Sequence, residues 1–524
     1  MEPESVDIVI VGAGLSGINA AYRVQTLLPH HSYAILEARA ELGGTWAFWK
    51  YPGIRTDSPM GLFGFHWRPW PHEVNMAPAP AIKSYMEECA AAEGIDKKIR
   101  FGHRVVSMSW STDEQCWTLQ VEVRPGIHGS DRDDSSSNNN SNNNNNNNNN
   151  DINNHDATAW ENKVIKAWWV IGASGYYNYE RPLPAFWDKD VDYAGKKVVI
   201  IGSGATAVTL LPKLAKTAAS VTMLQRTPSY VFGLPGTDKT VSQLARFMPL
   251  SWAQTVHWWQ SMLVETFFIW LLRTFPNWAR SFITQEMRKQ LPAHIDVDKH
   301  FKPWYNPLEQ RLCFCPNNDF FKALHRPNAG IVTDTIETVT ETGIKLRSSG
   351  GDGTEQQQQQ QQLEADVIVT ATGLYFELFS GVDVTVDGEP VTGPAIARRY
   401  IWNGAMLEGV PNAGLITGYT ASTWTPGADV RVRQLIKVIR HMDRTAAVSA
   451  TPCLDPRERA ALPARPAVGL SSTYMVSAHD RMPRVAGKAP WVNGDCWAVD
   501  AWRLFWSDVT QGMKYTFREV KKLV

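Results

Sequence analysis

The chain has 524 residues, which is enough for two or three domains and a large core. Its 52 lysines and arginines balance its 52 aspartates and glutamates, so no net charge favours nucleic acid or an acidic surface as a partner. The six cysteines contain no CxxC pair and the 13 histidines form no HxH or HExxH motif, so we expect no metal site. Cysteines scattered in this way favour free thiols in a reducing compartment, so we expect a cytoplasmic protein with Cys313 and Cys315 in its core.

The strand-like segment 7–11 stands close to the N-terminus. No basic and apolar leader precedes it, so a secretory signal is not expected. The most apolar stretch, residues 263–272, is ten residues long and carries Glu265, whereas a membrane-spanning helix needs about 20 apolar residues. We expect a core or interface helix there, and contact with a membrane surface is the less favoured interpretation.

Two low-complexity runs interrupt the chain: an Asn-rich run at 133–151 and a Gln run at 356–362. Neither can bury apolar surface, so we expect disordered loop insertions, the first of which extends over 133–156. Insertions in turns cost little, so each run is predicted to extend the turn of a β-hairpin. The strand-like segments on either side of the two runs are 117–123 and 164–175, then 343–346 and 363–373.

The segment DIVIVGAGLSG at 7–17 contains a hydrophobic strand, a GxGxxG turn and the start of a helical pattern. In such a turn Gly12 permits the tight bend, Gly14 lets a pyrophosphate approach the backbone, and Gly17 allows the helix to pack closely on the strand. The helix N-terminus offers N–H groups and a positive dipole to the phosphates. Glu37 ends a second strand about 20 residues on, where an acid holds a ribose diol. The pattern predicts a dinucleotide site.

The segment KVVIIGSGATA at 197–207 repeats this arrangement, with Ala207 in place of the third glycine. Its second strand ends in Arg226 rather than in an acid. A carboxylate would repel a 2′-phosphate, whereas a guanidinium can bind one through two parallel hydrogen bonds. The second site is therefore predicted to bind NADPH rather than NADH.

Two dinucleotide sites in one chain indicate two cofactors that exchange electrons, most simply FAD and NADPH. A flavin that reduces a disulfide needs a cysteine pair beside it, and the chain has no CxxC, so dioxygen or an organic acceptor is favoured. The expected fold class is α/β, with two Rossmann-like dinucleotide-binding domains. Residues 1–180 and 366–524 are predicted to form the FAD domain, which ends in a substrate-side segment. Residues 181–365 are predicted to form an NADPH domain that interrupts it and carries a helical insertion.

The stretch GGTWAFWKYPGIRTD at 43–57 fits the pattern (A/G)GxWxxxx(F/Y)P(G/M)xxxD. In this fingerprint the chain resembles the Baeyer–Villiger monooxygenases. The resemblance continues through GSGATAVTLLPKLA, MLQRTPSYV, YNPLEQRLC and ADVIVTATG, and it covers most of the chain outside the two low-complexity runs. The family is similar in fold to the flavin-containing N- and S-monooxygenases.

The resemblance implies that NADPH reduces FAD and that reduced FAD takes O2 to form a C4a-peroxyflavin. Attack on a ketone carbonyl then gives an adduct that rearranges to an ester or lactone, so the implied partners are O2 and a small organic substrate, most simply a ketone. Such chemistry needs a fixed positive charge beside the flavin and a closed, dry site. The family's active-site arginine matches Arg311, and the acid that orients it matches Asp57.

The resemblance also carries the family's cofactor residues over to this chain. The expected FAD-binding residues, which include the three glycines of the first turn, are Gly12, Gly14, Gly17, Glu37, Gly44, Thr45, Trp46, Asp57, Val105 and Gly373. The expected NADPH-binding residues are Arg55, Thr56, Gly202, Ser203, Gly204, Ala205, Thr206, Ala207, Val208, Arg226 and Thr227. Val105 is expected to offer its backbone to the adenine ring.

One segment departs from the family pattern. A second family signature, FxGxxxHxxxW(P/D), should precede the second Gly-rich turn, but the chain at 173–202 retains only Trp187 and Asp188 as its ending. In the family the histidine of that signature couples NADPH binding to domain motion, so its loss puts turnover in question. Two alternatives stay open: an oxygenase of soft nitrogen or sulfur, and a flavin-binding protein with lost or uncoupled turnover.

Overall fold

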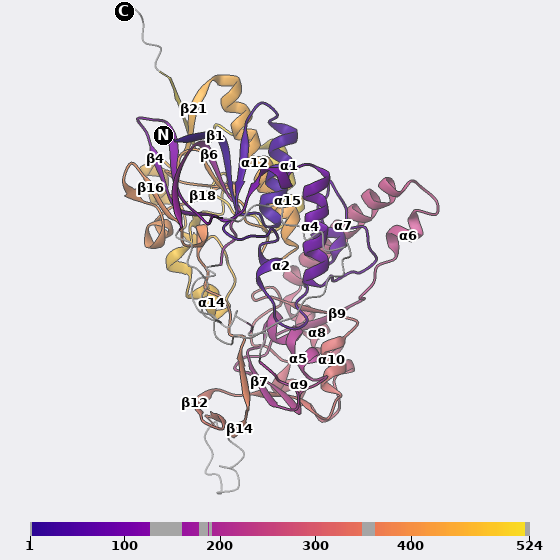
Figure 1. Ribbon diagram of the computed structural model, residues 1–524. Helices are drawn as coiled ribbons and strands as arrows, with labels where there is room; N and C mark the ends of the chain where they lie inside the picture. The colour runs from indigo at the N-terminus through magenta and orange to yellow at the C-terminus, as the bar shows by residue number, and fades with distance from the viewer. Residues whose placement is uncertain (1–2, 126–159, 178–186, 188–190, 348–361, 519–524) are drawn as a thin grey trace, which may run out of the picture.

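The computed structural model describes residues 3–125, 160–177, 187, 191–347 and 362–518. The predicted disorder at 133–156 and 356–361 lies outside these residues, and so do residues 178–186 and 188–190 of the segment that departs from the family pattern. Gln362, the last residue of the Gln run, begins a short strand. The predicted α/β architecture is confirmed, with one Rossmann-like unit in the upper half of Figure 1 and a second in the lower half.

The first sheet forms the N-terminal Rossmann-like unit. Its strand β1 (Glu4–Val11) pairs in parallel with β2 (Tyr33–Leu36) on one side and with β6 (Glu161–Gly172) on the other. Side chains alternate between the faces of a strand, so Ile8 and Ile10 enter one buried cluster while Val9 and Val11 enter another. The sheet order is β17-β16-β4-β5-β6-β1-β2-β3, and β20 (Ala413–Leu415) also pairs with β6.

Three helices cover the face of this sheet that Ile8 and Ile10 reach: α1 (Leu15–Leu27), α4 (Ala79–Ala92) and α12 (Trp424–Thr445). The outer strands are β3 (Ile99–Arg100), β4 (His103–Ser111), β5 (Cys116–Val123), β16 (Asp383–Val386) and β17 (Glu389–Pro390). Strands β5 and β6 stand on either side of the Asn-rich run and pair antiparallel, which confirms the first predicted hairpin.

The second sheet is parallel throughout, in the order β11-β8-β7-β15. Its strands are β7 (Lys197–Ile201), β8 (Ser220–Gln225), β11 (Ala329–Thr333) and β15 (Val367–Thr370), and α5 (Ala205–Leu214) follows β7. Beside it lie the antiparallel strands β12 (Ile336–Thr340), β13 (Gly343–Leu346) and β14 (Gln362–Glu364). Strands β13 and β14 pair as predicted for the second hairpin. The second unit extends past the boundary expected at residue 365, because β15 is its edge strand.

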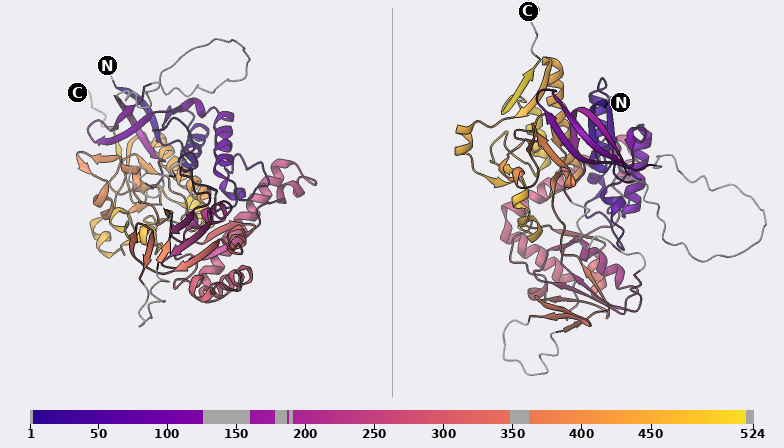
Figure 2. Two further views of the ribbon diagram at one scale, coloured as in Figure 1. Left: turned by 60° about the horizontal axis from the view of Figure 1, so that its bottom comes forward. Right: turned by 60° about the vertical axis from the view of Figure 1, so that its left-hand side comes forward.

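A helical segment lies between β9 (Val231–Leu234) and β10 (Cys313–Pro316), two strands that pair in parallel. It comprises α6 (Thr240–Leu244), α7 (Leu250–Thr274), α8 (Pro276–Gln290) and α9 (Val297–His300). The apolar stretch 263–272 is thus the second half of a 25-residue helix. The α6 region projects from the body at the right of Figure 1 and in the left view of Figure 2. Among the described residues, no helix is long and apolar enough to cross a membrane.

The thiols behave as predicted from their spacing. All six cysteines are free, and Cys313 and Cys315 on β10 are buried in the core of the second unit. Burial raises the pKa of both thiols to about 12, so they are uncharged core residues.

The C-terminal segment returns to the first unit, where β21 (Ala447–Pro452) pairs antiparallel with β24 (Met513–Phe517). Helix α15 (Trp497–Trp506) begins against α7, because the ring of Trp497 lies 5.1 and 5.3 Å from those of Trp258 and Trp259. The remaining short elements are α2 (Thr45–Phe48), α3 (Met60–Phe63), α10 (Asp319–Leu324), β18 (Ile401–Trp402), β19 (Met406–Leu407), α13 (Pro456–Ala461), β22 (Arg465–Pro466), α14 (Thr473–Val476) and β23 (Arg484–Val485).

Candidate functional site

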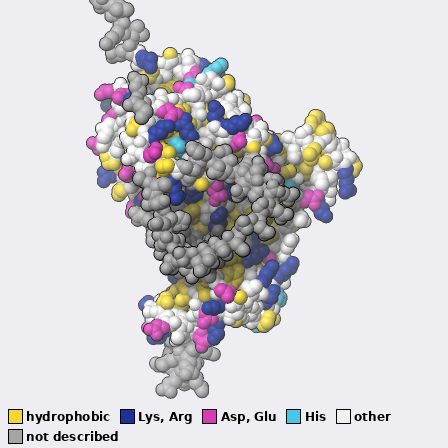
Figure 3. Space-filling model, in the orientation of Figure 1, with side chains coloured by type: hydrophobic (Ala, Val, Ile, Leu, Met, Phe, Trp, Pro, Cys, Tyr) yellow, Lys and Arg dark blue, Asp and Glu magenta, His cyan; other side chains and the backbone are white. Residues whose placement is uncertain are grey.

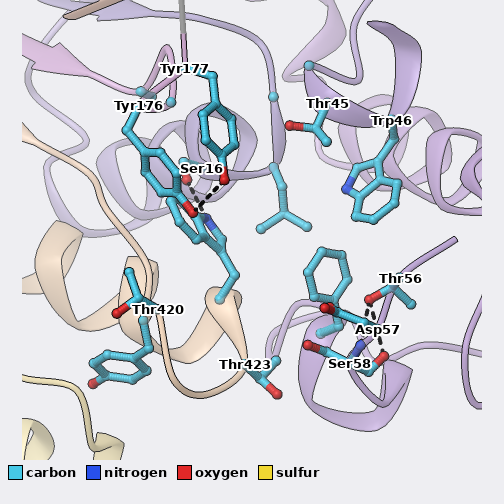
Figure 4. Close-up of a pocket in the computed structure, with 18 of the residues that line it drawn as sticks. Ser16, Thr45, Trp46, Thr56, Asp57, Ser58, Tyr176, Tyr177, Thr420 and Thr423 are labelled. Carbon is cyan, nitrogen blue, oxygen red and sulfur yellow. Dashed lines mark hydrogen bonds between the residues drawn. The ribbon is translucent and has the colours of Figure 1, made fainter. Parts of the chain in front are cut away.

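A cavity of about 1180 Å³ lies between the first unit and the helical segment. Its walls come from the first Gly-rich turn, the segments 43–58 and 173–177, the loop before β10, and α7. Figure 4 shows part of it, with Tyr176 and Tyr177 across the space from Thr45 and Trp46. The volume exceeds the range of about 300–1,000 Å³ that is usual for pockets of drug-sized ligands, so a dinucleotide and a small substrate have room together.

The first Gly-rich turn presents bare backbone to this cavity. Gly12 has φ +105°, and a Cβ on it would lie 2.9 Å from the carbonyl oxygen of Ala173. A Cβ on Gly17 would lie 1.9 Å from the carbonyl oxygen of Gly12. Helix α1 can therefore approach the turn this closely only because residue 17 is glycine. Helix α1 begins at Leu15 with no side-chain cap and no acid in its first turn, which leaves N–H groups to bind an anion.

Two predicted FAD residues complete the wall beside this turn. Glu37 at the end of β2 is 5% exposed, and its carboxylate accepts hydrogen bonds from the backbone N–H groups of Ala13 at 2.8 Å and Arg39 at 3.1 Å. These bonds fix the carboxylate beside the turn. Val105 on β4 lines the same cavity.

The fingerprint segment forms the next part of the wall. Gly44 has φ +54° and lies close to Gly14, whose added Cβ would be 3.6 Å from the Cα of Gly44. On helix α2, the ring of Trp46 packs edge-on against Phe63 with centroids 5.5 Å apart. Thr45, Thr56 and Asp57 also line the cavity, and the hydroxyl of Thr56 accepts a hydrogen bond from the Ser58 N–H at 3.0 Å (Figure 4).

The middle of the fingerprint contacts the second unit. Burial raises the pKa of the Tyr51 phenol to about 12, and the hydroxyl of Thr206 in the second unit opposes this rise through a hydrogen bond. Gly53 has φ +81°, and a Cβ on it would lie 2.4 Å from Cγ of Lys213 on α5. Tyr51 and Gly53 therefore join the two units.

Arg55, predicted to contact NADPH, is held by an acid of the second unit. Its guanidinium forms two contacts of 3.2 Å with the carboxylate of Asp319, at the start of α10. Burial raises the pKa of Asp319 and Arg55 opposes that rise. Arg55 therefore makes a second link between the units, and its side chain is only 7% exposed.

Arg311 reaches the cavity from the loop before β10. Its Nη2 donates hydrogen bonds to the phenol oxygens of Tyr176 at 2.9 Å and Tyr177 at 3.5 Å. Its buried Nε has no hydrogen-bond partner among the described residues. The acidic groups around it, Tyr474 first, then Tyr177 and Tyr176, and more weakly Asp57, raise the pKa of the guanidinium, which therefore stays charged.

The hydrogen bond expected between Asp57 and Arg311 is absent from the part of the chain that the structure describes, although both residues line the cavity. The two phenols, which directly follow the segment 173–175, accept the guanidinium N–H bonds instead. Burial raises the pKa of Tyr177, so its phenol stays neutral beside the guanidinium. Sequence reasoning missed these tyrosines, although their position after a buried strand of the first unit was the available signal.

The second Gly-rich turn has a different environment. None of the predicted NADPH residues at 202–208 and 226–227 is among the lining residues of the large cavity. A Cβ on Gly202 would lie 2.2 Å from the carbonyl oxygen of Ala371, whereas a Cβ on Gly204 would meet no atom of the described residues within 4 Å. Residues 205–208 form the first turn of α5, in which Ala207 and Val208 are buried. This turn is therefore tight at its first glycine and open at its second.

Three further predicted residues lie around that turn. The hydroxyl of Ser203 donates a hydrogen bond to the carbonyl of Thr227 at 2.9 Å, which ties the turn to the end of β8. Arg226 is exposed and donates to the hydroxyl of Thr473 at 2.7 Å. Gly373, predicted to bind FAD, has φ +112° and packs against Tyr474, so the structure does not bring it to the other FAD residues.

The α7 wall of the cavity was not predicted. His257 is buried and lies 3.4 Å from the carboxylate of Asp238, and its Nδ1 has no partner in the described ranges. Glu265 accepts hydrogen bonds from the N–H of Thr423 at 2.9 Å and from its hydroxyl at 2.7 Å. Burial raises the pKa of Glu265. Polar residues at helical spacing in an apolar helix were the available signal. Across the described residues, no cluster of ligands could hold a metal ion.

Comparison with known proteins identifies the family. A profile described as an NAD(P)-binding Rossmann-like domain matches residues 10–72, which include the first Gly-rich turn. The chain is 39% identical over 505 residues to the FAD-containing monooxygenase EthA of Mycolicibacterium smegmatis, and the match covers 93% of this chain and 92% of that protein. The chain belongs to the FAD-containing monooxygenase family.

Two solved structures share the fold of this FAD-containing monooxygenase. A complex of OTEMO with FAD and NADP matches with a TM-score of 0.69 at 17% identity, covering 98% of this chain and 100% of that chain. Oxidized steroid monooxygenase bound to NADP matches with a TM-score of 0.68 at 18% identity, with the same coverage. At these identities the similarity establishes the fold alone. The chemistry of this FAD-containing monooxygenase is therefore argued from the residues of its own site.

Proposed function

We propose that this protein is an FAD- and NADPH-dependent monooxygenase that inserts one oxygen atom of O2 into a ketone, giving an ester or lactone by Baeyer–Villiger oxidation. The balanced reaction converts ketone, O2, NADPH and one proton into ester, NADP⁺ and water. The observation that carries the proposal is a charged guanidinium, Arg311, in the same cavity as the first Gly-rich turn, Glu37 and the fingerprint segment.

The residues around the first turn fit FAD. The close approach of Gly14 to Gly44 leaves backbone where a pyrophosphate would lie, and α1 offers its N-terminal N–H groups. The fixed carboxylate of Glu37 would accept hydrogen bonds from the hydroxyl groups of the ribose. Thr45, Trp46 and Val105 stand on the same cavity wall, so we assign them to the flavin site.

The second turn fits NADPH. Gly204 leaves its surroundings open for a pyrophosphate, and Arg226 is exposed where the 2′-phosphate would lie. Ser203, Thr227 and the first turn of α5 complete this assignment. Arg55 and Thr56 belong to the fingerprint that links both units, so we assign them to the nicotinamide end.

FAD, when bound, would supply the redox chemistry: it accepts a hydride from NADPH and activates dioxygen. The chain itself supplies charge and exclusion of water. Arg311 would stabilise the negative charge that develops on the substrate carbonyl oxygen as oxygen adds to it. Tyr176 and Tyr177 hold the guanidinium through its Nη2. The rings of Trp46 and Phe63 make the adjoining wall apolar, which strengthens the electrostatic contact.

The test follows NADPH and O2 consumption by the purified, FAD-loaded protein with a panel of ketones and a matched panel of thioethers. The proposal expects ester or lactone formation that accounts for the NADPH consumed with at least one ketone. Sulfoxide formation with unchanged ketones would assign the protein to soft-atom oxygenation. NADPH consumption that yields only hydrogen peroxide with both panels would indicate uncoupled turnover and overturn the proposal.

A further inference from the structure

Helix α7 presents three different faces along its length. One face lines the cavity, with His257, Ser261, Val264 and Phe268. A second is buried in the body of the protein and includes Trp258, Met262 and Leu272. The third is exposed and apolar, and its residues with their exposed fractions are Trp252 69%, Val256 44%, Trp259 46%, Leu263 66%, Phe267 59% and Trp270 52%. Their spacing of three or four residues places them in one stripe along the helix.

Apolar side chains at the two ends of α7 extend this stripe. Phe247 (86% exposed) precedes the helix, Leu250 (57%) is its first residue, and Phe275 (50%) and Trp278 (48%) follow it. The aromatic face is the set of these four residues and the six residues of the stripe. Soluble proteins commonly expose single apolar side chains, but a contiguous apolar surface marks a site of interaction. Figure 3 shows apolar side chains gathered on the projecting α6 region at one end of this face.

Helix α15 adds a second exposed apolar surface that begins beside α7. Its members are Val499, Trp502, Phe505 and Trp506, all at least 46% exposed. Trp497 at its start packs on Trp259, and Arg273 at the end of α7 is paired with Asp495 just before α15. The two helices are therefore held together at two points.

The charge around the aromatic face is positive, although the whole chain is neutral. Residues 239–290 contain six basic residues: Lys239, Arg246, Arg273, Arg280, Arg288 and Lys289. The same stretch contains only two acids. Three of the basic residues are paired with acids: Arg273 with Asp495, Arg288 with Asp298, and Lys289 with Glu286. The positive charge beside the face therefore rests on Lys239, Arg246 and Arg280, which have no acidic partner among the described residues. The other acid, Glu265, is directed toward Thr423. A tryptophan-rich face with a basic surround complements the interface of a membrane that contains anionic lipids.

We propose that the aromatic face docks on a bilayer containing anionic lipids, with α7 lying in the interface rather than spanning it. A second copy of this chain is a poorer occupant, because a twofold contact would bring the same basic surround against itself. Docking would also place the cavity about one helix diameter, roughly 10 Å, from the lipid, since the opposite face of α7 is a cavity wall. Apolar substrates dissolved in the bilayer would then enter beside α7.

The experiment is flotation of the full-length, FAD-loaded protein with vesicles, which requires no turnover and is therefore independent of the proposed reaction. One vesicle set is phosphatidylcholine alone, and the other contains about one-third phosphatidylserine. The wild-type protein should float with the anionic vesicles, less with the neutral ones, and less again at high salt. The combined substitution Trp252→Ser, Leu263→Ser and Phe267→Ser should lower vesicle affinity by about tenfold or more.

The matched control is Trp160→Ser with Val339→Ser, which changes exposed apolar residues that belong neither to the aromatic face nor to α15 and should float like the wild type. The flavin absorbance of each variant verifies that it is folded. Wild-type protein that stays with the unbound fraction, or a face variant that floats like the control, would overturn the proposal. A dimer in sedimentation velocity that the face variant abolishes would assign the face to a second copy instead.

Discussion

The two Gly-rich turns of this chain share a sequence pattern but differ in what surrounds them. The first lines a cavity of about 1180 Å³, faces Gly44 across a narrow gap and is followed by the buried acid Glu37. The second lies outside that cavity, is open at Gly204 and is followed by the exposed Arg226. An enclosed turn suits a cofactor that stays bound, and an open turn suits one that must enter and leave in each cycle.

The largest expected effect concerns Arg311, which lies in the cavity and not beside the second turn. Replacing Arg311 with Ala should lower ester formation by about 10²–10³-fold, because a fixed donor to the developing charge is lost. NADPH-driven reduction of FAD should stay measurable, because the second turn is untouched. Arg311→Lys, which keeps a charge but not the planar fork, should recover only part of the activity. Product formation in Arg311→Ala at the wild-type rate would remove Arg311 from the mechanism.

The next effect distinguishes the turns by their packing. Gly17→Ala would place a Cβ 1.9 Å from the carbonyl oxygen of Gly12, and overpacking of this kind costs about 1–3 kcal/mol or more. We expect a protein that loses FAD and unfolds at a lower temperature. The Cβ of Gly204→Ala would meet no atom within 4 Å in the part of the chain that the structure describes, so the variant should keep its FAD and its melting temperature while its KM for NADPH rises. Thermal melts followed by flavin fluorescence compare the two, and equal losses of stability would show that the turns do not differ as described.

A smaller effect tests cofactor choice at the open turn. Arg226→Ala should raise the KM for NADPH about tenfold, because a charge-assisted contact to the 2′-phosphate is lost. The KM for NADH should be unchanged, since NADH has no such phosphate. Steady-state kinetics with both nucleotides measure the ratio. An equal change for both would place Arg226 outside the phosphate site.

The smallest effect concerns the α7 wall and depends on pH. Burial raises the pKa of Glu265, so folding favours its protonated form. Its contribution to stability is complete below the ordinary glutamate pKa and is lost as the pH rises through the raised value. Glu265→Gln should therefore gain in stability over the wild type as the pH rises, by at most about 1.4 kcal/mol for each unit of the shift. Thermal melts of both proteins over the acidic to neutral range test this, and a difference independent of pH would contradict it.

The sequence predicted the parts of the site that repeat a local pattern. Gly12, Glu37 and Trp46 occupy the same cavity because each belongs to a turn or strand end whose geometry is local. The two hairpins were also predictable, since β5 with β6 and β13 with β14 are close in sequence apart from the inserted runs. Such features need no knowledge of tertiary packing.

What sequence reasoning missed depends on contacts between distant segments. Tyr176 accepts a hydrogen bond from Arg311, which is 135 residues away in the sequence. Glu265 accepts one from Thr423, which is 158 residues away. The family pattern directed attention to Asp57 as the partner of Arg311, whereas among the described residues the phenols hold the guanidinium. The exposure of one face of α7 could not be predicted either, because apolar composition alone does not distinguish a buried side of a helix from an exposed one.

The most direct test of the proposed reaction is mass spectrometry of the product formed from a ketone under isotopically labelled dioxygen, with purified FAD-loaded protein and NADPH. The account predicts an ester or lactone that contains one labelled oxygen atom, and a strong decrease of that product in Arg311→Ala. Ketone recovered unchanged while NADPH is consumed would contradict it.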